Sequence, residues 1–541
     1  MSQNHRIVTV SSMRHLASID QDIELNNTPT NIGETQCIDS NKISSREKCN
    51  SVTNWYHKTA KIFACLNIEE RGIERVPSED RTDLTIINTA MIWVSANIII
   101  PCFAAGTLGP AVFELDLNNS FVTIIIFNLL GTLPIAGMAC FGPASGLRTM
   151  VFSRYSWGYY GASIMSIVNV MSAIGWAAVN SITGAQTLRV VFNDSFPITV
   201  GIIIIAIITM IISFIGYKWI HIYERYSWIP VFIGYCILAG VGAKYFTNSE
   251  MVFHNATIFS NSSTFRLELS CVLTFGSIIF GTACSWCPFA ADYNTYFPED
   301  TSQLKIFLLT YISNFVSMVV MQLLGAAAYT GTYTNQNWKQ AYEINNVGGL
   351  LGAILSPLRG FGKFILILFS LSIVACNIPN LYSLSLSTQV IAPIFSRIPR
   401  FLYTIIGTAA YVLLAIVAAS KFNDALTSVM GISSYWSAIF MVIVFEDHIL
   451  FRRCSFRNYN FSIWNSSKLL PISLAAILSA LVGVAGIILG MSQIWFSGPI
   501  AKAIAGDTNI KGADIGFEAG FIFTAVAFPL FRLIELYFIR R

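Results

Sequence analysis

The sequence predicts an all-α protein that crosses a membrane about twelve times. Of its 541 residues, 54% are hydrophobic and only 11% are charged, whereas soluble proteins carry about 25% charged residues. The apolar residues gather in runs close to the roughly 20 residues that a helix needs to cross a bilayer. These runs centre near Ile98, Leu129, Ala173, Ile207, Ile237, Phe280, Val316, Ile373, Leu413, Phe440, Val482 and Phe523.

Residues 1–81 differ from the rest of the chain. They are polar, rich in Ser, Asn, Glu and Arg, and contain no long apolar run. This composition predicts a cytosolic and largely disordered tail, and it does not match a cleaved signal peptide. Lysines such as Lys58 and Lys61 would make an exposed tail accessible to ubiquitin ligase machinery. The net charge of +4 is small and gives no reason to propose nucleic acid as a partner; the expected surroundings are the lipid bilayer.

The distribution of basic residues predicts the orientation, because loops rich in Lys and Arg stay in the cytosol. With the tail inside, the even-numbered connections and the C-terminus are inside, and these carry most of the basic residues. They include Arg148, Arg154, Lys218, Arg225, Arg397, Arg400, Arg452, Arg453, Arg457, Lys468, Arg540 and Arg541. Glycosylation sequons at Asn118, Asn193, Asn255 and Asn261 fall outside, although those at Asn460 and Asn465 fall inside. We expect both termini in the cytosol.

Two spans contain proline and glycine where an apolar anchor needs neither. The first runs through Trp93 to Pro101 and continues to Pro110, and the sixth runs through Phe275 to Pro288. Proline interrupts helical hydrogen bonding, and broken spans at corresponding places in two halves mark the binding sites of transporters. The first and sixth spans correspond if 82–246 and 247–446 are inverted five-helix repeats, with two further helices and a short cytosolic C-terminus in 447–541. The alternative is a pair of ordinary proline kinks.

Polar residues in the third and eighth spans strengthen the prediction of a cavity. Trp176 and Asn180 are four residues apart and share a helix face, and Asn377 and Asn380 are three apart beside a proline. Each Asn could instead join two helices. Because the mid-membrane stretches contain essentially no charged residue, and Trp and Asn suit a flat ring with polar edges, we expect a neutral heteroaromatic ligand such as a nucleobase. Helix ends alone could still hold a carboxylate.

Several motifs resemble those of fungal purine-cytosine permeases in the nucleobase-cation-symport-1 family. They cover the chain from Gly72 to the C-terminus and comprise Gly72–Asp83, Phe141–Arg148, Arg154–Gly158, Cys284–Tyr293 and Asn377–Ser383. The resemblance implies twelve helices in the inverted-repeat fold of the leucine-transporter class. It also implies proton-coupled uptake of adenine, guanine, hypoxanthine and cytosine at the plasma membrane.

The resemblance also assigns roles to the substrate site. It implies that Trp176 and Asn180 contact the base and that Trp286 stacks on its other face. The remaining substrate positions that it implies are Ser95, Asn97, Asn377 and Asn380. The hydroxyl-bearing sodium site of a bacterial relative is poorly matched, because mainly Ile373, Val374 and Ala375 precede Asn377. Protons are therefore the expected coupling ion, ahead of sodium.

A proton carrier should be a titratable group whose proton affinity changes during transport. Glu224, at the inner end of the fifth span, is the first candidate, and Asp292 after the sixth-span break is the second. Glu224 could instead form a surface pair with Arg225. All six histidines lie outside the predicted spans, so we expect no metal site and no cofactor.

Other functions remain as alternatives. A transporter of this fold could carry uracil, allantoin or a vitamin precursor. A membrane enzyme or a channel is a different class of protein. The sequence contains no HExxH, no Gly-x-Ser-x-Gly paired with His, no phosphate loop and no repeated filter. We therefore predict no catalytic residues.

Overall fold

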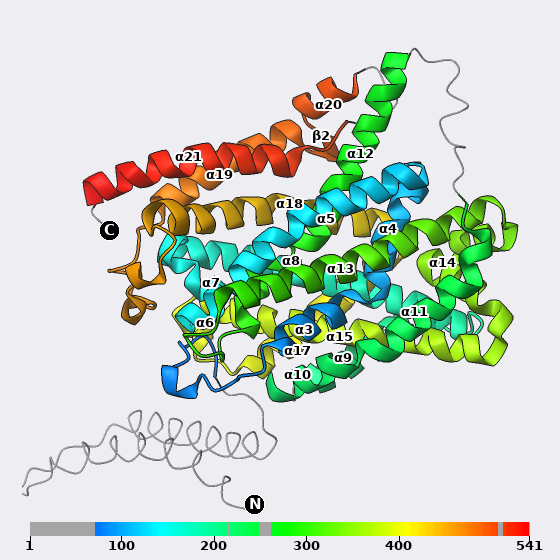
Figure 1. Cartoon of the computed structure of the whole chain (residues 1–541), viewed down its shortest axis with the longest axis horizontal. Helices are drawn as coiled ribbons and strands as arrows, with labels where there is room; N and C mark the ends of the chain where they lie inside the picture. Colours follow the sequence, from blue (N-terminus) through cyan, green and yellow to red (C-terminus); the bar gives the residue numbers. More distant parts are fainter. Residues whose placement is uncertain (1–70, 214–216, 248–260, 507–511, 540–541) are drawn as a thin grey trace, which may run out of the picture. The chain divides into compact units, whose positions relative to one another are not determined.

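The structure is a computed structural model, which describes residues 71–213, 217–247, 261–506 and 512–539. The predicted tail up to residue 70, including Lys58 and Lys61, lies outside the described residues, as do Arg540 and Arg541. From residue 71 on, the described chain is almost entirely helical (Figure 1).

The helices fall into three consecutive groups. The first group is α3 (Ile87–Asn97), α4 (Ile100–Val112), α5 (Leu117–Ala139), α6 (Phe141–Ser145), α7 (Thr149–Phe152), α8 (Arg154–Val191), α9 (Ile198–Ser213), α10 (Tyr217–Tyr226) and α11 (Trp228–Gly242). The second is α12 (Asn261–Cys284), the 3-10 helix η4 (Cys287–Tyr293), α13 (Gln303–Thr330), α14 (Gln336–Leu355), α15 (Arg359–Ile391), α16 (Pro393–Ser396), α17 (Arg400–Ala418) and α18 (Phe422–Glu446). The third is α19 (Leu474–Gly490), β1 (Ser492–Gln493), β2 (Phe496–Ser497), α20 (Pro499–Ala505) and α21 (Gly516–Ile539).

The described helices account for about twelve membrane passes. Eight helical segments are long and apolar enough to cross a bilayer, and one of them, Arg400–Phe451, contains both α17 and α18. The bent pair α3 and α4 forms a further span, and α9 and α19 are shorter apolar helices. This agrees with the all-α, twelve-span fold that the hydropathy predicts.

Helices at equivalent places in the first two groups pack against each other. The third-span helix α8 lies along the eighth-span helix α15, and the second-span helix α5 lies along the seventh-span helix α13. The broken first span contacts α13 through α4, and the sixth span contacts α5 and α18 through α12. Both broken spans are therefore surrounded by protein, where freed backbone groups are tolerated in a membrane.

Glycine allows the broken spans to approach their neighbours backbone to backbone. A Cβ atom on Gly106 of α4 would lie 1.9 Å from the carbonyl oxygen of Gln322 on α13. A Cβ atom on Gly281 of α12 would lie 2.1 Å from the carbonyl oxygen of Met430 on α18. Small residues at such crossings bring membrane helices into close contact, so these glycines determine the positions of both broken spans.

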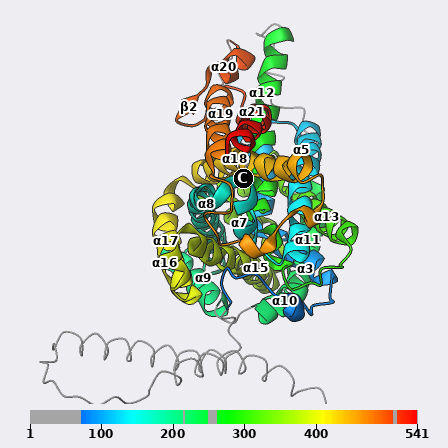
Figure 2. The same ribbon diagram turned by 90° about the vertical axis from the view of Figure 1, so that its left-hand side faces the viewer.

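The last two spans form a separate pair beside α18. Figure 2 shows α19 and α21 next to each other and next to α18, in agreement with their contacts. The connection between them is anchored by Asp514, whose carboxylate accepts hydrogen bonds from the Tyr435 hydroxyl of α18 and from Gln493 Nε2 at 3.1 Å. The backbone N–H of Asp514 also donates to Thr274 Oγ1 of α12 at 3.0 Å. The third group is thereby tied to α12 and α18.

Candidate functional site

The first span breaks between α3 and α4, which meet at an angle of 54°. The helix ends at Asn97, and Ile99 has extended backbone angles of φ −141° and ψ 163°. Pro101 stands in the first turn of α4, where its missing N–H costs no helical hydrogen bond. The first turn of a helix also leaves backbone N–H groups without a helical partner, and at α4 these groups are near the centre of the span.

The sixth span breaks after Cys284, where α12 ends. Ser285 and Trp286 form a turn, and the chain continues as the 3-10 helix η4 with Pro288 in its first turn. The Ser285 hydroxyl donates to the carbonyl oxygen of Thr282 at 2.8 Å and so satisfies one of the carbonyls at the end of α12. Both spans that the sequence marks as broken are broken in the structure.

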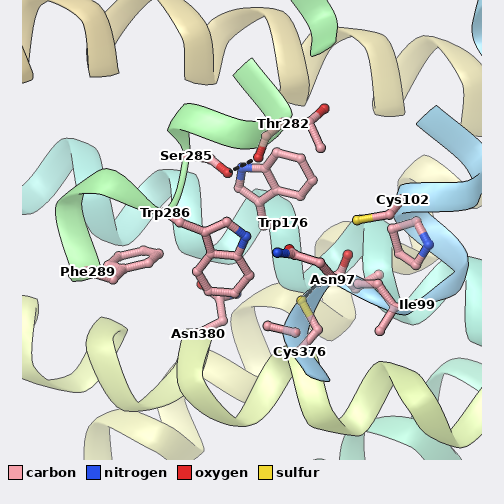
Figure 3. Close-up of a pocket in the computed structure, with 13 residues that line it drawn as sticks. Asn97, Ile99, Cys102, Trp176, Thr282, Ser285, Trp286, Phe289, Cys376 and Asn380 are labelled. Atoms are coloured by element: carbon pink, nitrogen blue, oxygen red, sulfur yellow. Dashed lines mark hydrogen bonds between the residues drawn. The ribbon is translucent and has the colours of Figure 1, made fainter. Parts of the chain in front are cut away.

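A cavity lies between the two breaks (Figure 3). Its walls come from the first, third, sixth and eighth spans. The lining residues are Ala96, Asn97, Ile99, Pro101, Cys102, Trp176, Asn180, Thr282, Ser285, Trp286, Phe289, Cys376 and Asn380. This lining contains no Asp, Glu, Lys, Arg or His, so the cavity suits an uncharged ligand.

Five of the seven predicted substrate residues line this cavity: Asn97, Trp176, Asn180, Trp286 and Asn380. Figure 3 shows the two indole rings, from the third and sixth spans, close to the Asn97 side chain. The sequence reasoning did not single out Thr282, Ser285, Phe289 or Cys376, which complete the lining. Thr282 and Ser285 are three residues apart in the broken segment, a spacing that places both hydroxyls on one face and could have indicated them.

The other two predicted residues do not line the cavity. Asn377 lies behind Asn180 and accepts a hydrogen bond from its Nδ2 atom at 2.9 Å. Ser95 faces α10 and α11, and its hydroxyl is 2.8 Å from that of Ser227. Ser95 and Asn97 are two residues apart, which puts their side chains on opposite sides of a helix. Asn377 therefore contacts the cavity residue Asn180 and not the cavity itself. Ser95 lies next to Ser227, the residue between α10 and α11.

The two indoles are held by contacts with neighbouring side chains. Trp176 Nε1 donates to the Ser433 hydroxyl of α18 at 3.0 Å. Trp286 packs edge-on against Trp93, with ring centres 5.6 Å apart, and against Phe289 at 6.1 Å. Such contacts restrict ring rotation and keep flat apolar faces available for stacking.

Glu224 is fully buried beside a second cavity between α3, the α10–α11 segment and α15. Ser95 lines this cavity and is the polar side chain that interacts with the Glu224 carboxyl. Within the described residues, neither carboxylate oxygen has a hydrogen-bond partner of ordinary geometry. Arg225 donates instead to Asn88 Oδ1, so the alternative of a surface pair between Glu224 and Arg225 does not describe this structure.

Asp292, the second proton-carrier candidate, is also buried but has several partners. Its carboxylate accepts hydrogen bonds from the backbone N–H of Thr149 at 2.7 Å and from the Ser383 hydroxyl at 2.9 Å. Arg148 donates to the carbonyl oxygen of Asp292 at 2.5 Å. Asp292 thus joins η4 to the segment before α8 and to α15, and it does not line the central cavity.

Together the fold and the cavity define the class of protein. A bundle of about twelve helices, with two broken spans enclosing a neutral cavity near their centres, is the architecture of a secondary transporter. A family described as "Permease for cytosine/purines, uracil, thiamine, allantoin" matches residues 75–505. The chain belongs to this family of membrane transporters, and it is a transporter and not an enzyme.

Curated relatives cover most of the chain. A purine-cytosine permease of Emericella nidulans is 40% identical over 487 residues, which are 90% of this chain and 92% of the relative. A purine-cytosine permease of Saccharomyces cerevisiae is 37% identical over 90% of this chain and 89% of the relative. A vitamin B6 transporter of the same yeast is 26% identical over 88% of this chain and 89% of the relative.

A solved structure shows the same fold. Mhp1, a nucleobase-cation-symport-1 family transporter, in a closed conformation with bromovinylhydantoin bound, matches with a TM-score of 0.62 at 14% identity, covering 87% of this chain and 95% of Mhp1. Its inward-facing conformation matches with a TM-score of 0.60 and 15% identity over 87% of this chain and 96% of Mhp1. The predicted leucine-transporter-like fold is therefore confirmed.

Proposed function

We propose that this protein is a proton-coupled symporter that takes up purine bases and cytosine across the plasma membrane by alternating access. The observation that carries the proposal is the central cavity, which combines two indole rings, three carboxamides and no charged side chain. A flat ring stacks on an indole, and a carboxamide matches the donors and acceptors at the edge of a base. Adenine, guanine, hypoxanthine and cytosine are the proposed substrates.

The cavity also offers hydrogen-bond donors. The first turn of α4, around Ile99 to Cys102, contributes backbone N–H groups that have no helical acceptor. These groups can donate to a ring nitrogen or a carbonyl of a neutral base. Because donors and acceptors come from different helices, a bound base would bridge the first, third and eighth spans and would favour closure around itself.

Proton coupling is proposed on the basis of Glu224. Glu224 is a fully buried titratable group, as a proton carrier must be if its surroundings are to control proton binding. Its carboxyl interacts with Ser95 of α3, which is part of the broken first span. A rearrangement of α3 would therefore change the surroundings of Glu224. The neighbouring positions Ile373, Val374 and Ala375 on α15 contain no hydroxyl group, which favours protons over sodium as the coupling ion. Asp292 is the second candidate.

The orientation and the alternative substrates are also proposals. Cytosolic termini follow from the distribution of basic residues. Four fungal relatives named purine-cytosine permeases are 36–40% identical to this chain, whereas the vitamin B6 transporter is 26% identical, which favours nucleobases over vitamin B6 and its precursors. Uracil and allantoin, which the description of the family names, are the main alternative substrates.

The decisive experiment is radiolabelled cytosine uptake in cells that lack their own base permeases, with unlabelled bases as competitors. We expect saturable uptake that adenine blocks and that a protonophore abolishes. The Trp176→Ala variant, checked for its amount at the cell surface, is the matched control for uptake through this site. Absence of uptake by correctly localised wild-type protein would refute the nucleobase assignment, and the same cells would then be tested with uracil, allantoin and pyridoxine.

A further inference from the structure

The carboxamide of Asn97 has one orientation with respect to the cavity. Its Nδ2 atom donates to Asn314 Oδ1 at 3.0 Å and to the Ser317 hydroxyl at 3.3 Å, both on α13 and both outside the cavity. The two hydrogens of Nδ2 are thereby used. Asn97 Oδ1 is buried and has no hydrogen-bond partner within the described residues. The free atom of this cavity-lining side chain is therefore an acceptor.

The orientation of Asn314 follows from the backbone of its own helix. Asn314 Nδ2 donates to the carbonyl oxygen of Thr310 at 3.0 Å, and a backbone carbonyl oxygen can only accept. Asn314 must therefore turn its Oδ1 atom toward α3. Since that oxygen can only accept, the atom of Asn97 that meets it must be Nδ2, and an exchange of the nitrogen and oxygen of Asn97 would bring two oxygens together.

Ser317 enforces the same polarity. Its hydroxyl donates to the carbonyl oxygen of Ser313 at 2.6 Å, so its single hydrogen is used within α13. Toward Asn97 the hydroxyl oxygen can only accept. Two independent groups on α13 thus require Asn97 to direct its nitrogen away from the cavity.

The other two cavity carboxamides have the same polarity. Asn380 Nδ2 donates to the carbonyl oxygen of Ala173 at 2.8 Å, and Asn180 Nδ2 donates to Asn377 Oδ1 at 2.9 Å. Asn180 Oδ1, like that of Asn97, is buried without a partner in the described part of the chain. The carboxamides of the first and third spans therefore keep buried oxygens free, which matches a ligand with N–H donors.

We infer that Asn314 and Ser317 are positioning residues that set the substrate specificity of the site, because they lock Asn97 as an acceptor for an N–H group of the substrate. The inference rests on the proposed function and names two specificity determinants outside the cavity. An exocyclic amine, as in cytosine, meets the Asn97 oxygen favourably. For uracil bound in the same orientation as cytosine, the carbonyl at this place would set oxygen against oxygen and leave both unsatisfied.

The test compares cytosine and uracil as competitors of labelled cytosine uptake in wild-type protein and in the Asn314→Ala variant. Loss of Asn314 removes the shorter of the two hydrogen bonds that orient the Asn97 carboxamide, which can then turn more easily and present its N–H groups. We expect the half-inhibitory concentration of cytosine to rise about three- to tenfold, as for one lost neutral hydrogen bond. We expect that of uracil to fall, so that the preference for cytosine over uracil decreases about tenfold or more.

Two control variants distinguish a change in substrate preference from a general disturbance of α13. Asn314→Asp in its neutral form keeps a donor for the Thr310 carbonyl and an acceptor for Asn97, and it should keep the wild-type preference. Ser313→Ala removes a buried hydroxyl from the same helix, one that donates only to the carbonyl oxygen of Thr310 at 3.2 Å, and it should also keep the preference. If Asn314→Ala does not reach the surface, Ser317→Ala provides the same comparison with a smaller expected change.

The outcomes distinguish this inference from the proposed function. Uptake of cytosine by wild-type protein, together with an unchanged cytosine-to-uracil preference in Asn314→Ala and Ser317→Ala, would refute the inference and leave the proposed function intact. A wild-type protein at the surface that transports no base would refute the proposed function and this inference with it. A loss of preference in Ser313→Ala as large as that in Asn314→Ala would also refute the specific role of Asn314.

Discussion

Replacement of Glu224 by glutamine tests the proposed proton coupling directly. Glutamine has nearly the same size and shape as glutamic acid but does not bind or release a proton. Glu224 does not line the central cavity, and within the described residues its carboxyl interacts with the Ser95 hydroxyl but has no hydrogen bond of ordinary geometry. The Glu224→Gln change therefore removes a titratable group without breaking an observed hydrogen bond, and base binding should be nearly unchanged.

The expected effect is on accumulation. If one proton moves with each neutral base, a membrane potential of 100 mV contributes about 2.3 kcal/mol, which corresponds to roughly a 40-fold concentration ratio. Without a proton carrier the base is transported down its own gradient only, and the ratio approaches one. We therefore expect Glu224→Gln to lose accumulation while it keeps exchange of labelled for unlabelled cytosine.

The assay uses the protein reconstituted in vesicles with an imposed membrane potential and pH gradient, and it measures accumulation and exchange in parallel. Glu343→Gln, at an exposed position on α14, is the matched control and should accumulate like the wild type. Protonophore-sensitive accumulation by Glu224→Gln at the wild-type level would refute the role of Glu224, and Asp292 would then be tested in the same way.

Three further predictions concern the cavity, the packing and the connection between the last two spans. Trp176→Ala should raise the KM for cytosine about 5- to 150-fold, because a base stacked on an aromatic ring gains about 1–3 kcal/mol, whereas Trp176→Phe should lose less; initial uptake rates measure both. Gly281→Ala should reduce the amount of folded protein, measured by size-exclusion chromatography of a fluorescent fusion, because the new Cβ would lie 2.1 Å from the Met430 carbonyl oxygen. Burial raises the pKa of Asp514 from 3.8 to about 6, so the folded protein binds this proton more tightly than the unfolded chain does, and stability should rise by about 1 kcal/mol between pH 7 and pH 5. Thermal unfolding of wild-type protein and Asp514→Asn at both pH values measures this, and an equal pH response in the two proteins would contradict it.

Hydropathy and local spacing predicted a large part of this structure. The spans follow from apolar runs of bilayer length, and both breaks follow from proline, glycine and polar residues inside such runs. Spacing also predicted that Trp176 and Asn180 share a helix face, and both line the cavity. These features depend on residues close together in the chain, so the sequence alone is sufficient to predict them.

The tertiary structure decided which of the polar faces meet at the cavity. Ser95 and Asn97 lie in one span, yet only Asn97 lines the central cavity, and Asn377 lies behind Asn180. Within a bilayer, faces toward lipid and faces toward protein are both apolar, so hydropathy does not tell the two apart. The hydrogen bond from Asn97 to Asn314 joins residues 217 positions apart, and only the packing of α3 against α13 brings them together.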